Sequence, residues 1–340
     1  MADVLLKVEN LTKQYAGEHK TSPIRAVADV SFEVMRGEVF SIVGESGCGK
    51  TTLGRCIARG LEASSGRVLY TPEDGAAADF LTADRASFRR LRKDIQLIFQ
   101  DPYSSLNPRM TVFDIIGEPL RANFKLTRRE LEERVRTIAE KTGLNPQYLR
   151  RYPHAFSGGQ RQRIGIARAL VTEPKLVICD EAVSALDVSI QAQIINLLKD
   201  LQEQLQMTYI FISHDLSVVE HLSDRVAVMY LGRIVELAPK GELFARPLHP
   251  YTESLLSSVP VPDPSGKRER ILLEGEVPNP ASPPAGCPFH PRCRFRTERC
   301  SVEAPELRET VAGRLAACHY AEELELEGVQ HGVSGHTAIG

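Results

Sequence analysis

Short apolar runs and longer amphipathic segments alternate along this chain, and their order predicts a mixed α/β fold. Runs typical of strands lie at 4–9, 28–34, 39–43, 95–99, 176–180 and 209–213, with a hairpin over 226–237. Amphipathic spacing predicts helices at 164–170 and from about Ile190 to Leu205. The strands at 176–180 and 209–213 are mostly apolar, which predicts that they are buried.

The segment between about residues 85 and 165 has a different pattern. Thr127 followed by Glu130 is the sequence of a capping box, which predicts that a helix starts there. The apolar residues of this helix share one face: Leu131, Val135, Ile138 and Ala139. Gly143 is expected to end it. We therefore expect a helical insertion in the α/β fold.

The strand at 39–43 leads into Gly44-Glu45-Ser46-Gly47-Cys48-Gly49-Lys50-Thr51-Thr52, and helix-compatible spacing follows. This stretch fits G-x-x-x-x-G-K-[ST], the phosphate-binding loop, in the strand–loop–helix context that the motif needs. Its glycines let backbone N–H groups turn toward a polyphosphate, next to the positive end of a helix. Lys50 can reach the β- and γ-phosphates, and Thr51 can bind Mg²⁺. A nucleotide site is favoured over a chance glycine-rich turn.

Polar residues at the ends of two buried strands extend this prediction. Asp180 is placed to hold Mg²⁺, directly or through water, and Glu181 to polarise an attacking water as general base. His214 can donate to the γ-phosphate and orient the water. Small residues that suit a γ-phosphate open a helix at Ser157, Gly158, Gly159 and Gln160. Without a phosphate loop, Asp180 and Glu181 would be interpreted as a solvated acidic turn, His214 as a structural histidine, and 157–160 as a plain N-cap. Together with the phosphate loop they predict an ATPase.

Composition adds limits on size and partners. The 340 residues suffice for a large α/β domain with an extension. A net charge of −2 gives no basic field that would attract nucleic acid. The sequence shows neither a secretory signal pattern at its start nor an apolar run near 18 residues. We expect a soluble or peripheral protein.

Four of the seven cysteines are grouped late in the chain, at Cys287, Cys293, Cys300 and Cys318. In a cytosolic ATP-using protein we expect a metal site here rather than disulfides. Four thiolates suit tetrahedral zinc or an iron–sulfur cluster, although no C-x-x-C pair is present. His290 and His319 are alternative ligands, and free thiols are the remaining alternative.

In this order, the motifs resemble those of the ATP-binding subunits of ABC transporters, over about residues 4–257. The resemblance implies a P-loop NTPase (RecA-like) core with an antiparallel β subdomain and an inserted helical subdomain. The implied ATP-binding residues are Tyr15, which would stack on adenine, with Gly44, Ser46, Gly47, Cys48, Gly49, Lys50, Thr51, Thr52, Gln100, Asp180, Ser157, Gly158, Gly159 and Gln160. The implied catalytic residues are Glu181, His214 and Gln100, and the implied Mg²⁺ ligands are Thr51, Gln100 and Asp180.

Further segments are similar to the dipeptide/oligopeptide/nickel importer branch: 101–108, 152–157, 248–252 and 286–293. The stretches 157–163 and 181–187 resemble its second, F-type, ATPase. This likeness implies an ATPase that powers peptide import, with nickel or other small solutes as the alternative cargo. It also implies a [4Fe–4S] cluster on the four late cysteines, with zinc as the alternative. Ala182 replaces a common proline, but it touches no phosphate.

The family arrangement also implies partners. Two ATPase domains sandwich two nucleotides, so Ser157 and Gly159 would contact ATP held by another chain. The implied assembly contains a D-type second ATPase, two membrane permease subunits docked after Gln100, and an extracytoplasmic substrate-binding protein, without nucleic acid. We accordingly expect a peripheral subunit on the cytoplasmic face of the inner membrane.

The expected domains are an ABC ATPase domain at 1–257, with its helical subdomain at about 85–165, an importer-type extension with the four-cysteine site at 258–328, and a disordered tail at 329–340. Two rival functions are a soluble ABC ATPase acting on nucleic acid or ribosomes and a non-hydrolysing nucleotide-binding regulator. The near-neutral charge and the absence of long heptads count against the first. The complete set of Gln100, Asp180, Glu181 and His214 counts against the second.

Overall fold

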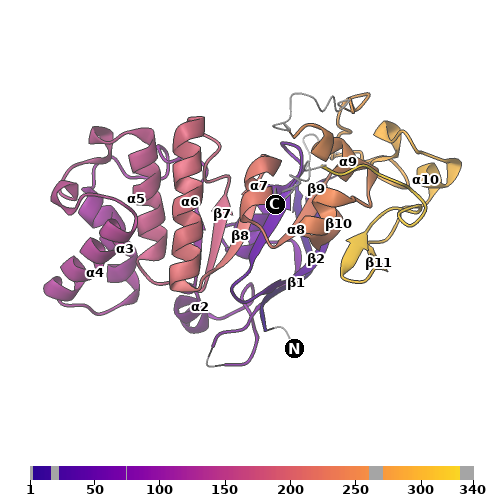
Figure 1. Ribbon diagram of the computed structural model, residues 1–340. Coiled ribbons are helices and arrows are strands. Elements are labelled where there is room, and N and C mark those ends of the chain that lie inside the picture. The colour runs from indigo at the N-terminus through magenta and orange to yellow at the C-terminus, as the bar shows by residue number, and fades with distance from the viewer. Residues whose placement is uncertain (1–2, 17–22, 74, 260–270, 330–340) are drawn as a thin grey trace, which may run out of the picture.

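An eight-stranded sheet, β11-β12-β10-β9-β3-β8-β7-β6, runs through the centre of the molecule (Figure 1). The computed structural model describes residues 3–16, 23–73, 75–259 and 271–329. Five neighbouring strands pair in parallel: β9 Arg225–Tyr230, β3 Val39–Val43, β8 Thr208–Ser213, β7 Leu176–Asp180 and β6 Ile95–Ile98. The carboxyl ends of parallel strands lie at one edge of a sheet, where ligands bind in α/β folds. The phosphate loop, Gln100, Glu181 and His214 all follow such ends.

The other strands of this sheet are antiparallel. β10 Arg233–Pro239 forms the predicted hairpin with β9, which is confirmed. β12 Arg314–Ala316 pairs with β10, and β11 Arg308–Val311 pairs with β12. The last two strands were not predicted, because they are only four and three residues long. They attach the C-terminal part of the chain to the central sheet.

A second, antiparallel sheet has the order β2-β1-β4-β5. Its strands are β1 Val4–Tyr15, β2 Ile24–Met35, β4 Ser65–Tyr70 and β5 Ala78–Asp79. The first two are longer than the apolar runs that predicted them, because they bend at register shifts and continue through polar residues. Phe32 of β2 stacks on Phe40 of β3 with ring centroids 4.8 Å apart, so the two sheets share one core.

The described helices surround these sheets. They are α1 Lys50–Ile57, α2 Arg85–Leu91, α3 Val112–Asn123, α4 Arg128–Lys141, α5 Gly158–Leu170, α6 Val188–Leu205, α7 Leu216–Leu222, α8 Lys240–Ala245, α9 Pro250–Ser257 and α10 Glu298–Val302. Short 3₁₀ turns lie at Pro146–Tyr148, Pro153–Ala155 and His290–Arg292. Among the residues described, none of the helices has the length and apolar content needed to cross a membrane.

Helices α3, α4 and α5 form a lobe on one side of the sheet (left in Figure 1). The capping box that starts α4 is confirmed: Thr127 Oγ1 accepts from the N–H of Glu130 at 3.3 Å, and the Glu130 carboxylate accepts from the N–H of Thr127 at 2.7 Å. The predicted apolar face is buried at Val135, Ile138 and Ala139. These side chains join one core with the central strands, which fixes the lobe against the sheet.

The C-terminal part lies on the opposite side of the sheet (yellow in Figure 1). Its Phe289 is buried against Tyr230 of β9 and Tyr251 of α9, at ring centroid distances of 5.4 and 5.5 Å. Residues 260–270, within the expected extension, lie outside the described residues, as do 330–340 of the expected tail.

Candidate nucleotide-binding site

The phosphate loop connects β3 to α1 through a backbone that requires glycine at Gly44 and Gly49. Gly49 has φ 108°, and a Cβ there would lie 2.0 Å from the carbonyl oxygen of Ala26. A Cβ on Gly44, at φ 151°, would lie 2.2 Å from the carbonyl oxygen of Met229. Gly49 also caps α1, which begins at Lys50. The loop therefore packs tightly on the strands beneath it and leads directly into a helix N-terminus, the feature that favours phosphate.

Lys50 is held inside this loop. Its Nζ donates to the carbonyl oxygens of Gly44 and Glu45 at 2.7 and 2.9 Å, and the residue is 5% exposed. Ser46 and Gly47 are exposed at the loop tip, whereas Cys48 is buried, and burial raises the pKa of its thiol. Backbone oxygens of the loop thus fix the position of the ammonium group.

Thr51 and Asp180 come together as expected for a Mg²⁺ site. Thr51 Oγ1 donates to Asp180 Oδ1 at 2.7 Å. Asp180 is completely buried, and burial raises the pKa of its carboxyl. Among the described residues its Oδ2 has no hydrogen-bond partner, and Arg55 Nε lies 3.7 Å from it. A buried carboxylate oxygen without a partner beside a hydroxyl fits a hard divalent cation, so these residues suit Mg²⁺.

The Glu181 carboxylate is contacted by Gln100 and His214, and the three residues follow the ends of three different strands. Gln100 Nε2 donates to Glu181 Oε2 at 2.7 Å, and His214 Nδ1 lies 3.3 Å from Glu181 Oε1. In the described contacts, Gln100 therefore touches Glu181 rather than the Thr51–Asp180 pair. Glu181 has φ 46°, a strained left-handed conformation that its N–H, donating to Ile212 O at 3.0 Å, helps to hold.

Ser157 to Gln160 lie apart from the phosphate loop. Ser157 caps α5, with its hydroxyl accepting from the N–H of Gln160 at 3.4 Å. A Cβ on Gly159 would lie 2.5 Å from Ile190 Cγ2, so this turn packs closely on α6. Across the described part of the chain, no hydrogen bond or ion pair joins 157–160 to 44–52.

Tyr15 and Thr52 complete the predicted set. Tyr15 ends β1 with 40% of its surface exposed, and Lys13 Nζ lies 5.2 Å from its ring centroid. An exposed ring there can stack on a planar base. Thr52 is half-buried in the first turn of α1.

Sequence reasoning missed two residues that contact this loop. The Arg292 guanidinium pairs with the Glu45 carboxylate, and the Tyr251 hydroxyl accepts from the N–H of Glu45. Both lie in segments noted for their resemblance, 286–293 and 248–252, but nothing in the linear spacing points to the loop. Arg292 is 247 residues from Glu45 in sequence.

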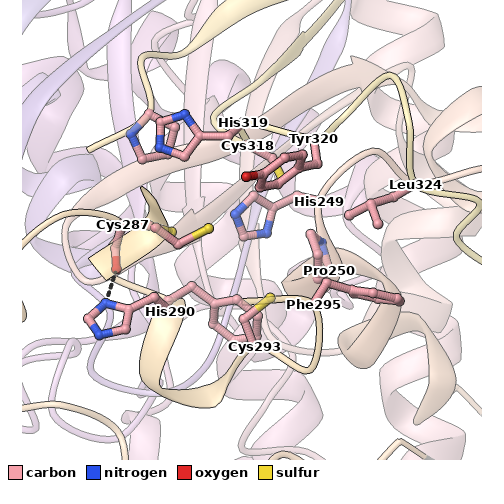
Figure 2. A pocket seen from close by; sticks show the side chains of 13 residues that line it. His249, Pro250, Cys287, His290, Cys293, Phe295, Cys318, His319, Tyr320 and Leu324 are labelled. Carbon is pink, nitrogen blue, oxygen red and sulfur yellow. Dashed lines mark hydrogen bonds between the residues drawn. The ribbon is translucent and has the colours of Figure 1, made fainter. Parts of the chain in front are cut away.

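The four late cysteines line one small pocket, together with His249, His290 and His319 (Figure 2). Cys287 and Cys300 are buried, and Cys293 and Cys318 are half-buried. Burial, together with the neighbouring thiols, raises the pKa of Cys287 to about 11 and that of Cys318 to about 12. In the ranges described, however, no three His, Cys, Asp or Glu side chains converge closely enough to hold a metal ion. The donor set fits a four-thiolate group, whereas the sulfur positions do not form a closed ligand shell.

Comparison with known proteins decides the family. Residues 27–184 match the family described as "ABC transporter", and residues 235–300 match "Oligopeptide/dipeptide transporter, C-terminal region". The chain is 55% identical to a probable peptide ABC transporter ATP-binding protein, y4tS, of Sinorhizobium fredii, covering 94% of this chain and 90% of that one. It belongs to the ABC transporter ATP-binding proteins.

Other members of the ABC family support this assignment. The oligopeptide transport ATP-binding protein AppF of Bacillus subtilis is 52% identical, covering 89% of this chain and 91% of that one. The ATP-binding cassette MJ0796, solved as a dimer in a post-hydrolysis state with ADP and Pi, superposes with a TM-score of 0.61 at 27% identity, over 69% of this chain and 99% of that one. The expected P-loop NTPase fold and the ATPase class are confirmed.

Proposed function

We propose that this ABC ATPase powers the import of dipeptides or oligopeptides, by hydrolysing ATP at the site built on Gly44–Thr52. The observation that carries the ATPase mechanism is the Glu181 carboxylate held by Gln100 and His214 next to the Thr51–Asp180 pair. Peptide as cargo is supported by the oligopeptide/dipeptide C-terminal region and by relatives named as peptide transport proteins. No feature favours nickel, other small solutes, nucleic acid or ribosomes.

In the proposed mechanism, the loop and Lys50 bind the phosphates, and Tyr15 stacks on the adenine. Thr51 and Asp180 would hold Mg²⁺, which would supply positive charge to neutralise the phosphates. Glu181 orients and deprotonates the attacking water as general base. His214 and Gln100 hold the Glu181 carboxylate in place and contact the γ-phosphate or its water.

We propose that each complete site forms between two chains. The separation of 157–160 from 44–52 supports this arrangement, since each chain would supply one part of two sites. Ser157, Gly158, Gly159 and Gln160 then contact ATP on a D-type second ATPase. Closing and reopening of the pair drives two permease subunits docked near the segment after Gln100, and an extracytoplasmic binding protein delivers the cargo. This places the chain on the cytoplasmic face of the inner membrane.

For the domains, we propose an ATPase domain at 1–257 with a helical subdomain at about 85–165, an extension at 258–328 and a tail at 329–340. We propose further that the extension's four cysteines hold a [4Fe–4S] cluster, with zinc as the alternative. The shared pocket of the four thiols supports a metal group. Anaerobic purification tests it: a brown protein with iron and sulfide supports the cluster, and a colourless protein with one zinc per chain contradicts it.

Purification of the tagged chain from native membranes tests the function as a whole. We expect a second ATPase, two permeases and a binding protein to co-purify, and the binding protein to bind peptides in a ligand screen. Co-purification with ribosomes or nucleic acid, in place of a permease, would contradict the proposal.

A further inference from the structure

The phosphate loop is tied to the C-terminal part of the chain by an ion pair on Glu45. Arg292 Nη1 lies 2.8 Å from Glu45 Oε2, and Nη2 lies 3.1 Å from Oε1. The pair is bidentate, and the Arg292 side chain is only 7% exposed. Hydrogen bonding to the Glu45 carboxylate raises the pKa of the Arg292 guanidinium above its ordinary value. Bidentate charge-assisted pairs that are shielded from water are among the stronger side-chain contacts.

The backbone of Glu45 is held from the same side. Its N–H donates to the hydroxyl of Tyr251 at 2.8 Å. Tyr251 is completely buried and packs on Phe289, three residues before Arg292. The carbonyl oxygen of Glu45 accepts from Lys50 Nζ at 2.9 Å. Glu45 therefore connects Arg292 and Tyr251 to the lysine that binds phosphate.

The charge of Glu45 gives the pair a second role. Glu45 lies in the loop that surrounds the phosphates, so an unpaired carboxylate there would repel the nucleotide. Arg292 neutralises this carboxylate. Arg292 itself ends the turn His290–Arg292, directly before Cys293 of the cysteine pocket. The contact is thus made by the C-terminal part of the chain.

We propose that Arg292 is a positioning residue for ATP binding: it fixes and neutralises Glu45, so that the C-terminal region sets the affinity of the phosphate loop for nucleotide. The proposal rests on the binding of ATP at Gly44–Thr52. It predicts an effect on nucleotide affinity and little effect on the chemical step, because Glu181, Gln100 and His214 do not contact Arg292 among the described interactions.

The first test is the Kd of the full-length chain for ADP, measured by titration calorimetry. Arg292→Ala should raise the Kd about five- to twentyfold, because it removes two charge-assisted hydrogen bonds and exposes the phosphates to an unpaired carboxylate. Arg292→Lys, which keeps the charge, should recover part of this loss. Arg308→Ala removes an exposed ion pair with Glu322 in the same region and should leave the Kd unchanged. In the assembled transporter, Arg292→Ala should raise the KM for ATP and leave kcat within about twofold.

A double-mutant cycle separates this role from a general loss of structure. Glu45→Ala keeps the backbone carbonyl that holds Lys50, and in that background Arg292→Ala should change the Kd less than twofold. An equal effect of Arg292→Ala in both backgrounds would overturn the proposal, as would wild-type affinity in Arg292→Ala. Failure of the unmodified chain to bind ADP or ATP would overturn the nucleotide site as well, so the two failures are distinguishable.

Discussion

At the scale of single residues, the proposed chemistry depends on Glu181. Its carboxylate is held by Gln100 at 2.7 Å and lies 3.3 Å from His214, and its backbone is in the left-handed region. Such strain persists only where the surroundings enforce it, and it is common at functional sites. The strained backbone aims the carboxylate at a position between the two partners, next to Asp180.

Glu181→Gln should bind ATP with near-normal affinity and lose about 10²- to 10⁴-fold in hydrolysis, because an amide cannot accept the proton of the attacking water. The variant should also accumulate a closed, ATP-bound complex with its partner ATPase. Steady-state hydrolysis and gel filtration with ATP measure both effects, with the partner's own site inactivated so that it does not mask the loss.

Glu173→Gln is the matched control for that experiment. Glu173 is exposed and has a left-handed backbone of φ 55°, but it lies at the end of the turn after α5 and away from the site. It should retain full activity. Retained turnover in Glu181→Gln itself would contradict the role of the general base.

At the scale of elements, sequence pattern predicted the strands that carry the site and the capped start of α4. Alternating polarity, apolar runs and capping residues are local features of the sequence, so they can be recognised without knowing the partners of each segment. The strands at 308–316 and the Arg292–Glu45 pair were not predicted. β12 pairs with the distant β10 and Arg292 with the distant Glu45, so local pattern carries no trace of these two contacts. β11 and β12 are neighbours in sequence, but four and three residues are too few to show an alternating pattern.

Removing the cap of α4 tests the element most clearly defined by sequence. Thr127→Ala should lower the free energy of unfolding by about 1 kcal/mol and the Tm by about 2–4 °C, because it leaves helical N–H groups without an acceptor. Thr137→Ala, in the middle of the same helix, should be neutral or slightly stabilising. Thermal melts of the two variants compare them directly, and equal Tm values would contradict the capping account.

The carboxyl group of Glu236, at the junction of β10, β12 and α9, is expected to make the stability of the fold depend on pH. Its carboxylate accepts from the N–H groups of Leu248 and His249 at 2.8 and 2.9 Å, and Arg314 Nη2 lies 3.6 Å away. Burial outweighs these contacts and raises the pKa of Glu236 to about 7. The folded chain therefore keeps a proton that the unfolded chain loses near pH 4.3. This contribution to stability is complete below that pH and is lost as pH rises through about 7.

As the pH rises from 5 to 8, the free energy of unfolding of the wild type should accordingly fall by on the order of 1–3 kcal/mol relative to that of Glu236→Gln, in which residue 236 cannot titrate. Urea unfolding at several pH values measures the difference. Glu242→Gln removes an exposed carboxylate that also lies near Arg314, and it should keep the wild-type pH profile. Parallel pH profiles for wild type and Glu236→Gln would contradict a raised pKa.

At the scale of the whole molecule, the C-terminal region is part of the fold rather than an appendage. β12 extends the central sheet at β10, and Phe289 and Arg292 pack against β9 and the phosphate loop. Within the described residues no hydrogen bond or ion pair joins 157–160 to 44–52, which agrees with our proposal that each complete site forms between two chains. The ATPase class could be predicted from sequence because its motifs are contiguous. The contact between the C-terminal region and the phosphate loop could be identified only from the structure.

The most direct test of peptide import is uptake of a labelled peptide into proteoliposomes that contain this chain, its partner ATPase, both permeases and the binding protein. We predict that uptake requires ATP on the side of the membrane that carries the ATPase subunits, and that peptide-loaded binding protein stimulates it. Glu181→Gln, with the partner site also inactivated, should abolish uptake. Uptake that is independent of ATP, or ATP-driven uptake of Ni²⁺ with no uptake of peptide, would contradict it.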